Sequence, residues 1–392
     1  MPQENFHALH AALQSQVNRQ FLAGVSTALL RGHEVVDRFC CGHADIEAGI
    51  ALREDHIHRV FSNTKLVTSC AVMMLVEEGK LRLEDAIERY IPELGQRQVL
   101  RAGATHVDQT EPAQHSITVQ HLMTHTSGLS YGAFDPGTVL FAAYNKAGVH
   151  TPVSPMAGMV KVLEQLPLSF QPGTRWEYSV ATDVLGYLVE VVSGESLGAF
   201  FARRIFDPLG LVDTDFWVPI AKQTRLTALY GGVDLLDPMK PGLKRMDDKP
   251  FPGAYLRKIP RESGGGGLVS TLGDMVRLIQ ALMPGGPTLL KPETLALMNR
   301  NHLPPGLHVQ FPNMPTNPGR GFGLGSSVLT VPGRFDPPQA ADEVSWGGVA
   351  GTVWWINPRL NIAGVLMTQR YMGFGNPYTF EFKRLAYQAL GF

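Results

Sequence analysis

Apolar stretches near both ends of the chain predict β-strands. Residues 23–30 and 34–41 are rich in Val, Leu, Phe and Cys, and the Arg31-Gly32-His33 turn between them predicts a hairpin. Further strands are predicted near the other end, at residues 323–330, 344–356 and 362–368. Strands that are joined by tight turns at both ends of a chain indicate an antiparallel sheet.

Between and around these strands, apolar residues recur at helical spacing. Helices are predicted at residues 1–21, 62–79, 81–91, 118–124, 159–166, 182–192, 197–206, 271–283 and 378–390. Thr118 and Thr271 are the predicted N-caps of their helices. Helices from both ends of the chain and from residues 62–79 would cover the faces of the sheet.

Three segments show little periodicity, at residues 96–115, 131–155 and 207–262. We interpret the last as a candidate wall of an active site, because long loops in compact domains are usually functional. The whole pattern predicts an α+β protein. Residues 1–81 and 205–392 would form a sheet domain, residues 82–204 a helical domain, and the active site would lie in the cleft between them.

Composition narrows the function classes. The chain has 392 residues, of which 44% are hydrophobic, and it carries 34 basic and 35 acidic side chains. This balance gives no support for a nucleic-acid partner. No stretch is long and apolar enough to span a bilayer, and the first residues lack the apolar core of a secretory signal. Cys40, Cys41 and Cys70 form no disulfide framework, so we expect a cytoplasmic protein, with a secreted protein that has lost its signal as the alternative.

The candidate chemistry begins at Ser62 and Lys65, which are three positions apart at the start of a predicted helix. Their side chains would share one helix face. The positive field of a helix N-terminus disfavours an ammonium, so Lys65 could lose its proton and activate the Ser62 hydroxyl. The alternative is a capping serine followed by a surface lysine, and the four-residue pattern alone does not exclude it.

Two other segments could complete such a site. The glycines of Trp346-Gly347-Gly348-Val349 indicate either a bulge or a close backbone approach to a ligand, where a free N–H could bind a developing oxyanion. Tyr178 could move a proton between Ser62 and a leaving group, although a packed aromatic residue is the simpler interpretation.

Three other motifs are set aside. Gly128-Leu129-Ser130-Tyr131-Gly132 has the spacing of an α/β-hydrolase elbow, but a helix precedes it, so Ser130 is interpreted as a loop residue. His121 and His125 lack a further metal ligand, so a structural or loop-anchoring role is expected. The glycine run at 264–267 lacks the Lys-Ser/Thr of a phosphate loop and would let the backbone pass close to the site.

Taken together in chain order, Ser62-x-x-Lys65, Tyr178-Ser179-Val180 and Trp346-Gly347-Gly348 resemble the serine β-lactamase and penicillin-binding-protein superfamily. The chain is most similar to the family VIII carboxylesterases, the EstB-like esterases with a class C β-lactamase fold. The resemblance extends over nearly the whole chain. It implies a β-lactamase/DD-peptidase-like fold, in which helices flank a five-stranded antiparallel sheet beside a mainly helical lobe.

By that resemblance, Ser62 is the acylated nucleophile, and Lys65 and Tyr178 are its proton-transfer partners. The N–H groups of Ser62 and Val349 would form the oxyanion hole, and Trp346, Gly347 and Gly348 would contact the substrate. No metal and no organic cofactor is implied.

Two departures from the antibiotic-processing members concern substrate choice. Those members usually carry Lys-Thr-Gly where this chain has Trp346-Gly347-Gly348, and Asn where it has Val180. A β-lactam carboxylate would therefore lose its expected anchors.

We accordingly expect a serine carboxylesterase that hydrolyses short-chain neutral esters, with a small-molecule ester as its partner. The alternatives on the same fold are a β-lactamase or D-alanyl carboxypeptidase and an acyltransferase. A non-catalytic binding protein is the alternative from another class. The oligomeric state is left open.

Overall fold

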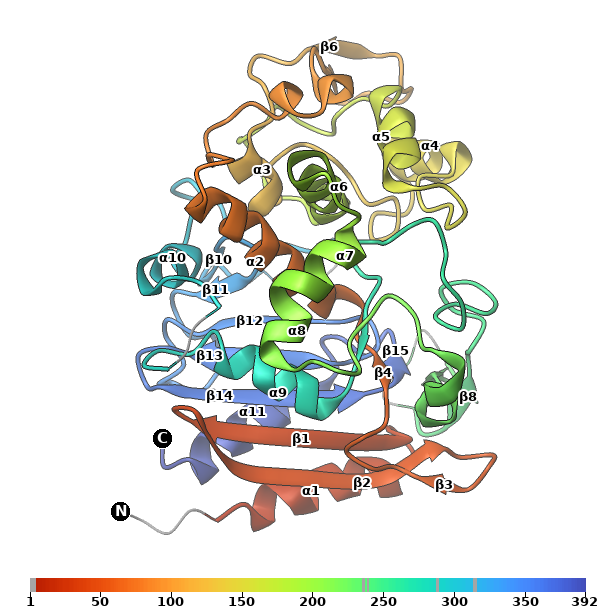
Figure 1. Cartoon of the computed structure of the whole chain (residues 1–392), viewed down its shortest axis with the longest axis vertical. Coiled ribbons are helices and arrows are strands. Elements are labelled where there is room, and N and C mark those ends of the chain that lie inside the picture. Colours follow the sequence, from red (N-terminus) through yellow and green to blue (C-terminus); the bar gives the residue numbers. More distant parts are fainter. Residues whose placement is uncertain (1–4, 235–236, 238–239, 287–288, 313–315) are drawn as a thin grey trace.

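The computed structural model describes residues 5–234, 237, 240–286, 289–312 and 316–392. The predicted segments 1–21 and 207–262 each include positions outside these ranges. Figure 1 shows one large sheet with helices against it and a mainly helical region stacked beyond α2. Helices α1 (His7–Asn18) and α11 (Pro377–Ala389) lie beside the sheet.

The main sheet joins the two ends of the sequence. In spatial order its strands are β10 (Arg320–Phe322), β11 (Ser327–Leu329), β12 (Val344–Gly347), β13 (Val353–Asn357), β14 (Ile362–Thr368), β1 (Gly24–Arg31), β2 (Glu34–Asp45) and β3 (Ile50–Ala51). All neighbouring strands are antiparallel. β1 pairs with β14 from Val25 opposite Thr368 to Arg31 opposite Ile362. The first strand in the sequence is thus held by the last strand of this sheet.

The strands β1, β13 and β14 are buried on both faces, and successive residues of a strand face opposite sides. In β13, Trp354 packs in the larger core with α2 (Thr64–Glu77) and α9 (Leu272–Gln280), whereas Trp355 packs in the second core with α1 and α11. Strands that are buried on both faces have continuous apolar sequences, which is why the sequence predicts them.

The sheet has eight strands in the described chain, where the sequence predicts five. Residues 344–356 are two strands, β12 and β13, because the chain reverses at a turn in which Gly351 has a φ of +78°. Residues 323–330 hold the turn and the second strand of another hairpin, β10–β11, with Gly325 at a φ of +107°. A glycine adopts such angles at little cost, so the chain reverses within an otherwise apolar stretch. The short β3 was not predicted.

The remaining elements surround this sheet. The other strands are β4 (His58–Arg59), β5 (Gln98–Leu100), β6 (Thr110–Pro112), β7 (Tyr230–Gly232), β8 (Leu243–Arg245), β9 (Val269–Ser270) and β15 (Arg370–Tyr371). The other helices are α3 (Val119–Met123), α4 (Val139–Ala147), α5 (Met156–Glu164), α6 (Ala181–Ser193), α7 (Leu197–Phe201), α8 (Asp207–Leu209) and α10 (Pro292–Met298), with the short turns η1 (Phe61–Asn63), η2 (Ile87–Arg89), η3 (Pro92–Leu94) and η5 (Ile220–Arg225) and the π-helical η4 (Ala202–Phe206). Thr118 and Thr271 cap α3 and α9 as predicted.

The helix expected at residues 81–91 is wrong, and two of the segments with little periodicity contain regular elements. Residues 81–91 form no α-helix but only the turn η2, because the Ile87 N–H bonds to the Ile117 carbonyl at 2.8 Å and ties the segment to a distant one. Residues 96–115 contain the hairpin β5–β6, and residues 131–155 contain α4. Tertiary hydrogen bonds and an N-cap at Thr138 outweigh the weak local pattern in these segments.

One apolar core crosses from the sheet into the helical region. It includes Val365 of β14, Val72 of α2 and Leu188 of α6, so α2 packs between the two regions. The division into a sheet domain and a helical domain stays a prediction.

In the described ranges no single helix is long and apolar enough to cross a membrane. Helix α6 and the segment Leu197–Leu209 would meet the length and composition criterion only as a pair, bent by 79°. The predicted compartment is not tested by this finding.

Candidate active site

Ser62 lies in a strained turn that leads into α2. Phe61, just before it, has a φ of +43°, a left-handed conformation that is unusual for a bulky residue. The buried Phe61 ring packs edge-on against Tyr255 and Tyr371, with centroid distances of 6.1 and 6.4 Å. The Thr64 hydroxyl donates to the Phe61 carbonyl at 2.6 Å. Strain of this kind persists where the surroundings enforce it, and it occurs preferentially at functional sites.

The structure brings Ser62, Lys65 and Tyr178 together. The Tyr178 hydroxyl donates to Ser62 Oγ at 2.8 Å, and Lys65 Nζ lies 3.5 Å from the same oxygen. Lys65 is 1% exposed, and its Nζ also donates to the Gly265 carbonyl at 2.6 Å. Ser62 is half-buried. A serine hydroxyl in contact with two groups that can carry its proton has the geometry of an activated nucleophile.

The rings around Lys65 help to hold its charge. Lys65 Nζ lies 4.7 Å from the ring centroid of Tyr178 and 5.7 Å from that of Tyr131, which are cation–π distances. The Tyr131 and Tyr178 rings stack at 5.4 Å.

His125 fixes the segment that contains Tyr178 through contacts with Ser179. Its Nδ1 accepts the Ser179 N–H at 3.3 Å and lies 3.1 Å from the Ser179 hydroxyl. Complete burial and the nearby charge of Lys65 hold the pKa of His125 well below its usual range, so the imidazole is neutral. His121 completes the N-cap of α3 through Thr118. Both histidines therefore have the structural contacts that the sequence predicts, and the described residues contain no cluster able to hold a metal ion.

The glycine run at 264–267 passes between α2 and α6. The Thr68 hydroxyl of α2 donates to the Gly264 carbonyl at 2.7 Å. A Cβ on Gly264 would lie 2.9 Å from the Thr182 carbonyl of α6, so only glycine fits. This close passage carries the Gly265 carbonyl to Lys65, in line with the expectation from the sequence.

The Trp346–Val349 segment lies against the Ser62 turn. A Cβ on Gly348 would lie 2.4 Å from the Val60 carbonyl, so the backbone just after β12 approaches the chain two residues before Ser62. In the described part of the chain, the N–H groups of Ser62 and Val349 donate no hydrogen bond to protein. Each is therefore available to an oxygen of a bound molecule, as an oxyanion hole requires.

Five partly exposed aromatic residues stand around Tyr178, and we call them the aromatic wall: Tyr131, Phe134, Phe311, Trp346 and Phe374. The centroids of the Phe134, Phe311 and Trp346 rings lie 5.4 to 5.5 Å from that of Tyr178. Phe374 completes the wall at 6.1 Å from Phe134 and 6.4 Å from Phe311. None of the five carries a charge at neutral pH, so this side of the site favours uncharged groups.

The other sequence candidates lie outside this cluster or at its edge. Ser130 is buried in a loop after α3, and its hydroxyl donates to Asp135 at 3.3 Å, which agrees with its interpretation as a loop residue. From residues 207–262, Tyr255 contacts Phe61, so part of this segment does border the Ser62 turn.

Comparison with known proteins identifies the family. A model of the β-lactamase family matches residues 9–388.

The chain belongs to the β-lactamase family.

Two curated relatives are similar to this chain in sequence, and one solved structure is similar to it in fold. Esterase EstB of Burkholderia gladioli is 32% identical over 397 residues, which cover 97% of this chain and 94% of EstB. The acyltransferase calJ of Penicillium decumbens is 32% identical over 362 residues, covering 89% and 84%. Simvastatin synthase LovD of Aspergillus terreus superposes with a TM-score of 0.81 at 23% identity, covering 98% and 97%. The predicted superfamily and its α+β fold are confirmed.

Within this β-lactamase fold, the sequence pattern did not indicate that Phe134, Phe311 and Phe374 lie at the site. They come from three loops without periodicity, and the richness of residues 131–155 in aromatic residues was the only signal.

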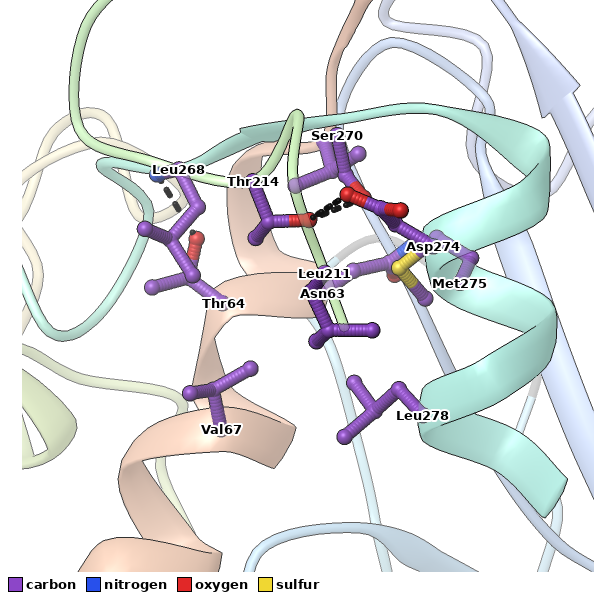
Figure 2. Close-up of a pocket in the computed structure, with 11 residues that line it drawn as sticks. Asn63, Thr64, Val67, Leu211, Thr214, Leu268, Ser270, Asp274, Met275 and Leu278 are labelled. Carbon is purple, nitrogen blue, oxygen red and sulfur yellow. Dashed lines mark hydrogen bonds between the residues drawn. The ribbon is translucent and has the colours of Figure 1, made fainter. Parts of the chain in front are cut away.

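A small enclosed cavity lies beside the Ser62 turn but is not the substrate site. It measures about 10 Å³ and is lined by Asn63 and Val67 from the Ser62 turn and α2, and by Thr214, Asp274 and Met275 opposite them (Figure 2). That volume holds one water molecule at most. The cavity is therefore too small for an ester substrate.

Proposed function

We propose that this member of the β-lactamase family is a serine carboxylesterase that hydrolyses short-chain neutral esters through an acyl-enzyme on Ser62. The class of serine hydrolase is supported by the family and by the 32% identity to EstB, a named esterase. The single observation that carries the mechanism is the 2.8 Å hydrogen bond from Tyr178 to Ser62 Oγ, with Lys65 Nζ at 3.5 Å.

The proposed reaction has two steps. Ser62 Oγ attacks the ester carbonyl while Lys65 or Tyr178 takes its proton, and the N–H groups of Ser62 and Val349 bind the oxyanion. Tyr178 then gives a proton to the leaving alcohol. A water molecule attacks the acyl-enzyme, its proton passes to the same pair, and Ser62 is released with the carboxylic acid. The residues supply all the proton transfers, so the proposed reaction needs no metal and no cofactor.

The uncharged side chains of the aromatic wall support the proposal that the substrates are neutral. Trp346 packs between Phe322 and Tyr178, at 5.3 and 5.4 Å, at the position where the resemblance to antibiotic-processing members calls for a lysine. An anionic group there would be desolvated without a cationic partner. The cost of that desolvation favours esters over β-lactams, which carry a carboxylate.

The test compares hydrolysis of p-nitrophenyl butyrate and nitrocefin by the wild-type protein and by Ser62→Ala. We expect fast ester cleavage, slow or absent nitrocefin turnover, and loss of both in the variant. Fast nitrocefin turnover would favour the β-lactamase alternative. Esterase activity that survives in Ser62→Ala, or failure of a fluorophosphonate to label the wild type, would contradict the proposal.

Acyl transfer is a second candidate. It is favoured by the 32% identity to calJ, a named acyltransferase. An acyl-enzyme can react with an alcohol in place of water, and the apolar wall would suit an alcohol with a large apolar body. Adding such an alcohol to the esterase assay decides between ester hydrolysis and acyl transfer. Ester product that forms faster than free acid would make this protein an acyltransferase.

A further inference from the structure

Asp183 is a buried carboxylate beside the candidate site that the proposed reaction does not use. It lies in the first turn of α6, five residues after Tyr178, and is 6% exposed. Its Oδ1 accepts hydrogen bonds from the Ser263 hydroxyl at 2.5 Å and from the Gly265 N–H at 3.1 Å. The positive end of the α6 dipole stabilises a carboxylate in this place. Asp183 therefore binds the segment that carries the glycine run, through Ser263 and Gly265, from the side of α6.

Gly265 connects Asp183 to Lys65. Its N–H binds Asp183, and its carbonyl accepts from Lys65 Nζ at 2.6 Å. A Cβ on Gly265 would lie 2.4 Å from Asp183 Oδ2, so the backbone is pressed against the carboxylate. Asp183 and Lys65 thus bind the two polar backbone groups of Gly265, its N–H and its carbonyl. A displacement of Asp183 would move the carbonyl that orients Lys65.

The charge of Asp183 also reaches the Ser62 cluster. The pKa of Tyr131, which stacks on Tyr178, is raised well above its usual value by burial first and then by the nearby Tyr178 and Asp183. Asp183 likewise acts on Arg261, whose pKa burial lowers and Asp183 partly restores. Asp183 is thus linked to Lys65 through Gly265, and the rings of Tyr131 and Tyr178 lie against Lys65 itself.

We propose that Asp183 is a positioning residue that acts through Gly265, fixing the carbonyl that holds Lys65 Nζ beside Ser62. The inference rests on the proposed role of Lys65 as a proton carrier. It assigns no contact between Asp183 and the substrate, so binding should be little affected when Asp183 is changed.

The test uses Asp183→Asn, which keeps the size of the side chain and an acceptor for Gly265 but removes the charge. We expect kcat for p-nitrophenyl butyrate to fall roughly 10- to 100-fold with KM nearly unchanged. The matched control is Glu190→Gln, which removes another carboxylate from α6. The Glu190 carboxylate accepts a hydrogen bond from the Leu197 N–H.

A second variant separates geometry from charge. Gly265→Ala keeps Asp183 but pushes the backbone away from it, so kcat should fall with KM nearly unchanged. If Asp183→Asn fails to fold, Gly265→Ala decides, and a wild-type kcat there would overturn the inference. So would an Asp183→Asn enzyme that matches Glu190→Gln in kcat. Ser62→Ala distinguishes the two claims, because activity that survives in that variant would overturn the proposed function itself.

Discussion

Replacing Tyr178 by phenylalanine removes one hydroxyl and leaves the rest of the site in place. The ring is 7% exposed and would keep its stacking on Tyr131 at 5.4 Å and its contact with Trp346 at 5.4 Å. The change deletes the 2.8 Å hydrogen bond to Ser62 Oγ. The variant therefore isolates the proton-transfer role that we propose for Tyr178.

The expected loss of rate is much larger than the expected loss of stability. A positioned proton-transfer group contributes roughly 10²- to 10⁴-fold in rate, which corresponds to about 3 to 5 kcal/mol of activation free energy. The deleted hydrogen bond contributes only about 1 kcal/mol to the free energy of unfolding. A catalytic role and a packing role thus differ by at least about 2 kcal/mol in their predicted effects.

The assay measures kcat and KM on p-nitrophenyl butyrate and the free energy of unfolding in urea. The control is Tyr131→Phe, which removes a hydroxyl from the ring stacked on Tyr178 but leaves the bond to Ser62 intact. We expect Tyr131→Phe to keep most of the wild-type kcat. A Tyr178→Phe enzyme whose kcat equals that of Tyr131→Phe would refute the reasoning.

Three more changes have expected outcomes. Lys65→Met should lower kcat/KM by roughly 10²- to 10⁴-fold. Adding Tyr178→Phe to it should lower kcat/KM little further, because the effects of groups that act as a unit are not additive. Steady-state rates of the two single variants and the double variant check this. Trp346→Lys should raise the ratio of nitrocefin to ester turnover by supplying a cation, and an unchanged ratio would contradict the role given to Trp346. Burial lowers the pKa of His58 to about 4. The unfolded chain gains this proton near a pH of about 6.5, so stability is full above that pH and falls below it, by about 2 kcal/mol at pH 5. Urea unfolding at pH 8 and pH 5 measures the loss, and His58→Asn should reduce it.

The strands could be predicted wherever burial of both faces leaves a continuous apolar sequence. β1 and β14 are of this kind. The same property concealed the turn between β12 and β13, because Trp354 and Trp355 are both buried and the one polar residue at the reversal, Thr352, is buried as well. The helix predicted at residues 81–91 failed for a different reason. Its Ile87 N–H bonds to Ile117, a partner that no local pattern reveals.

The site could be predicted in part for similar reasons. Ser62 and Lys65 are one helical turn apart, so their spacing alone places them together, and Tyr178 followed from the family resemblance. Phe311 lies in a loop whose path depends on the whole fold, so sequence spacing could not place it at the site. Asp183 looks like an ordinary acid in the first turn of a helix. Only its contact with Gly265 shows that it reaches Lys65.

The most direct test of the central claim is to trap the acyl-enzyme. The protein is mixed with p-nitrophenyl butyrate, quenched in acid during turnover, and analysed by intact-mass and peptide mass spectrometry. The account predicts one added butyryl group, located on the peptide that contains Ser62, and no adduct in Ser62→Ala. A butyryl group on another residue, or turnover without any covalent adduct in a protein that is fully active, would contradict it.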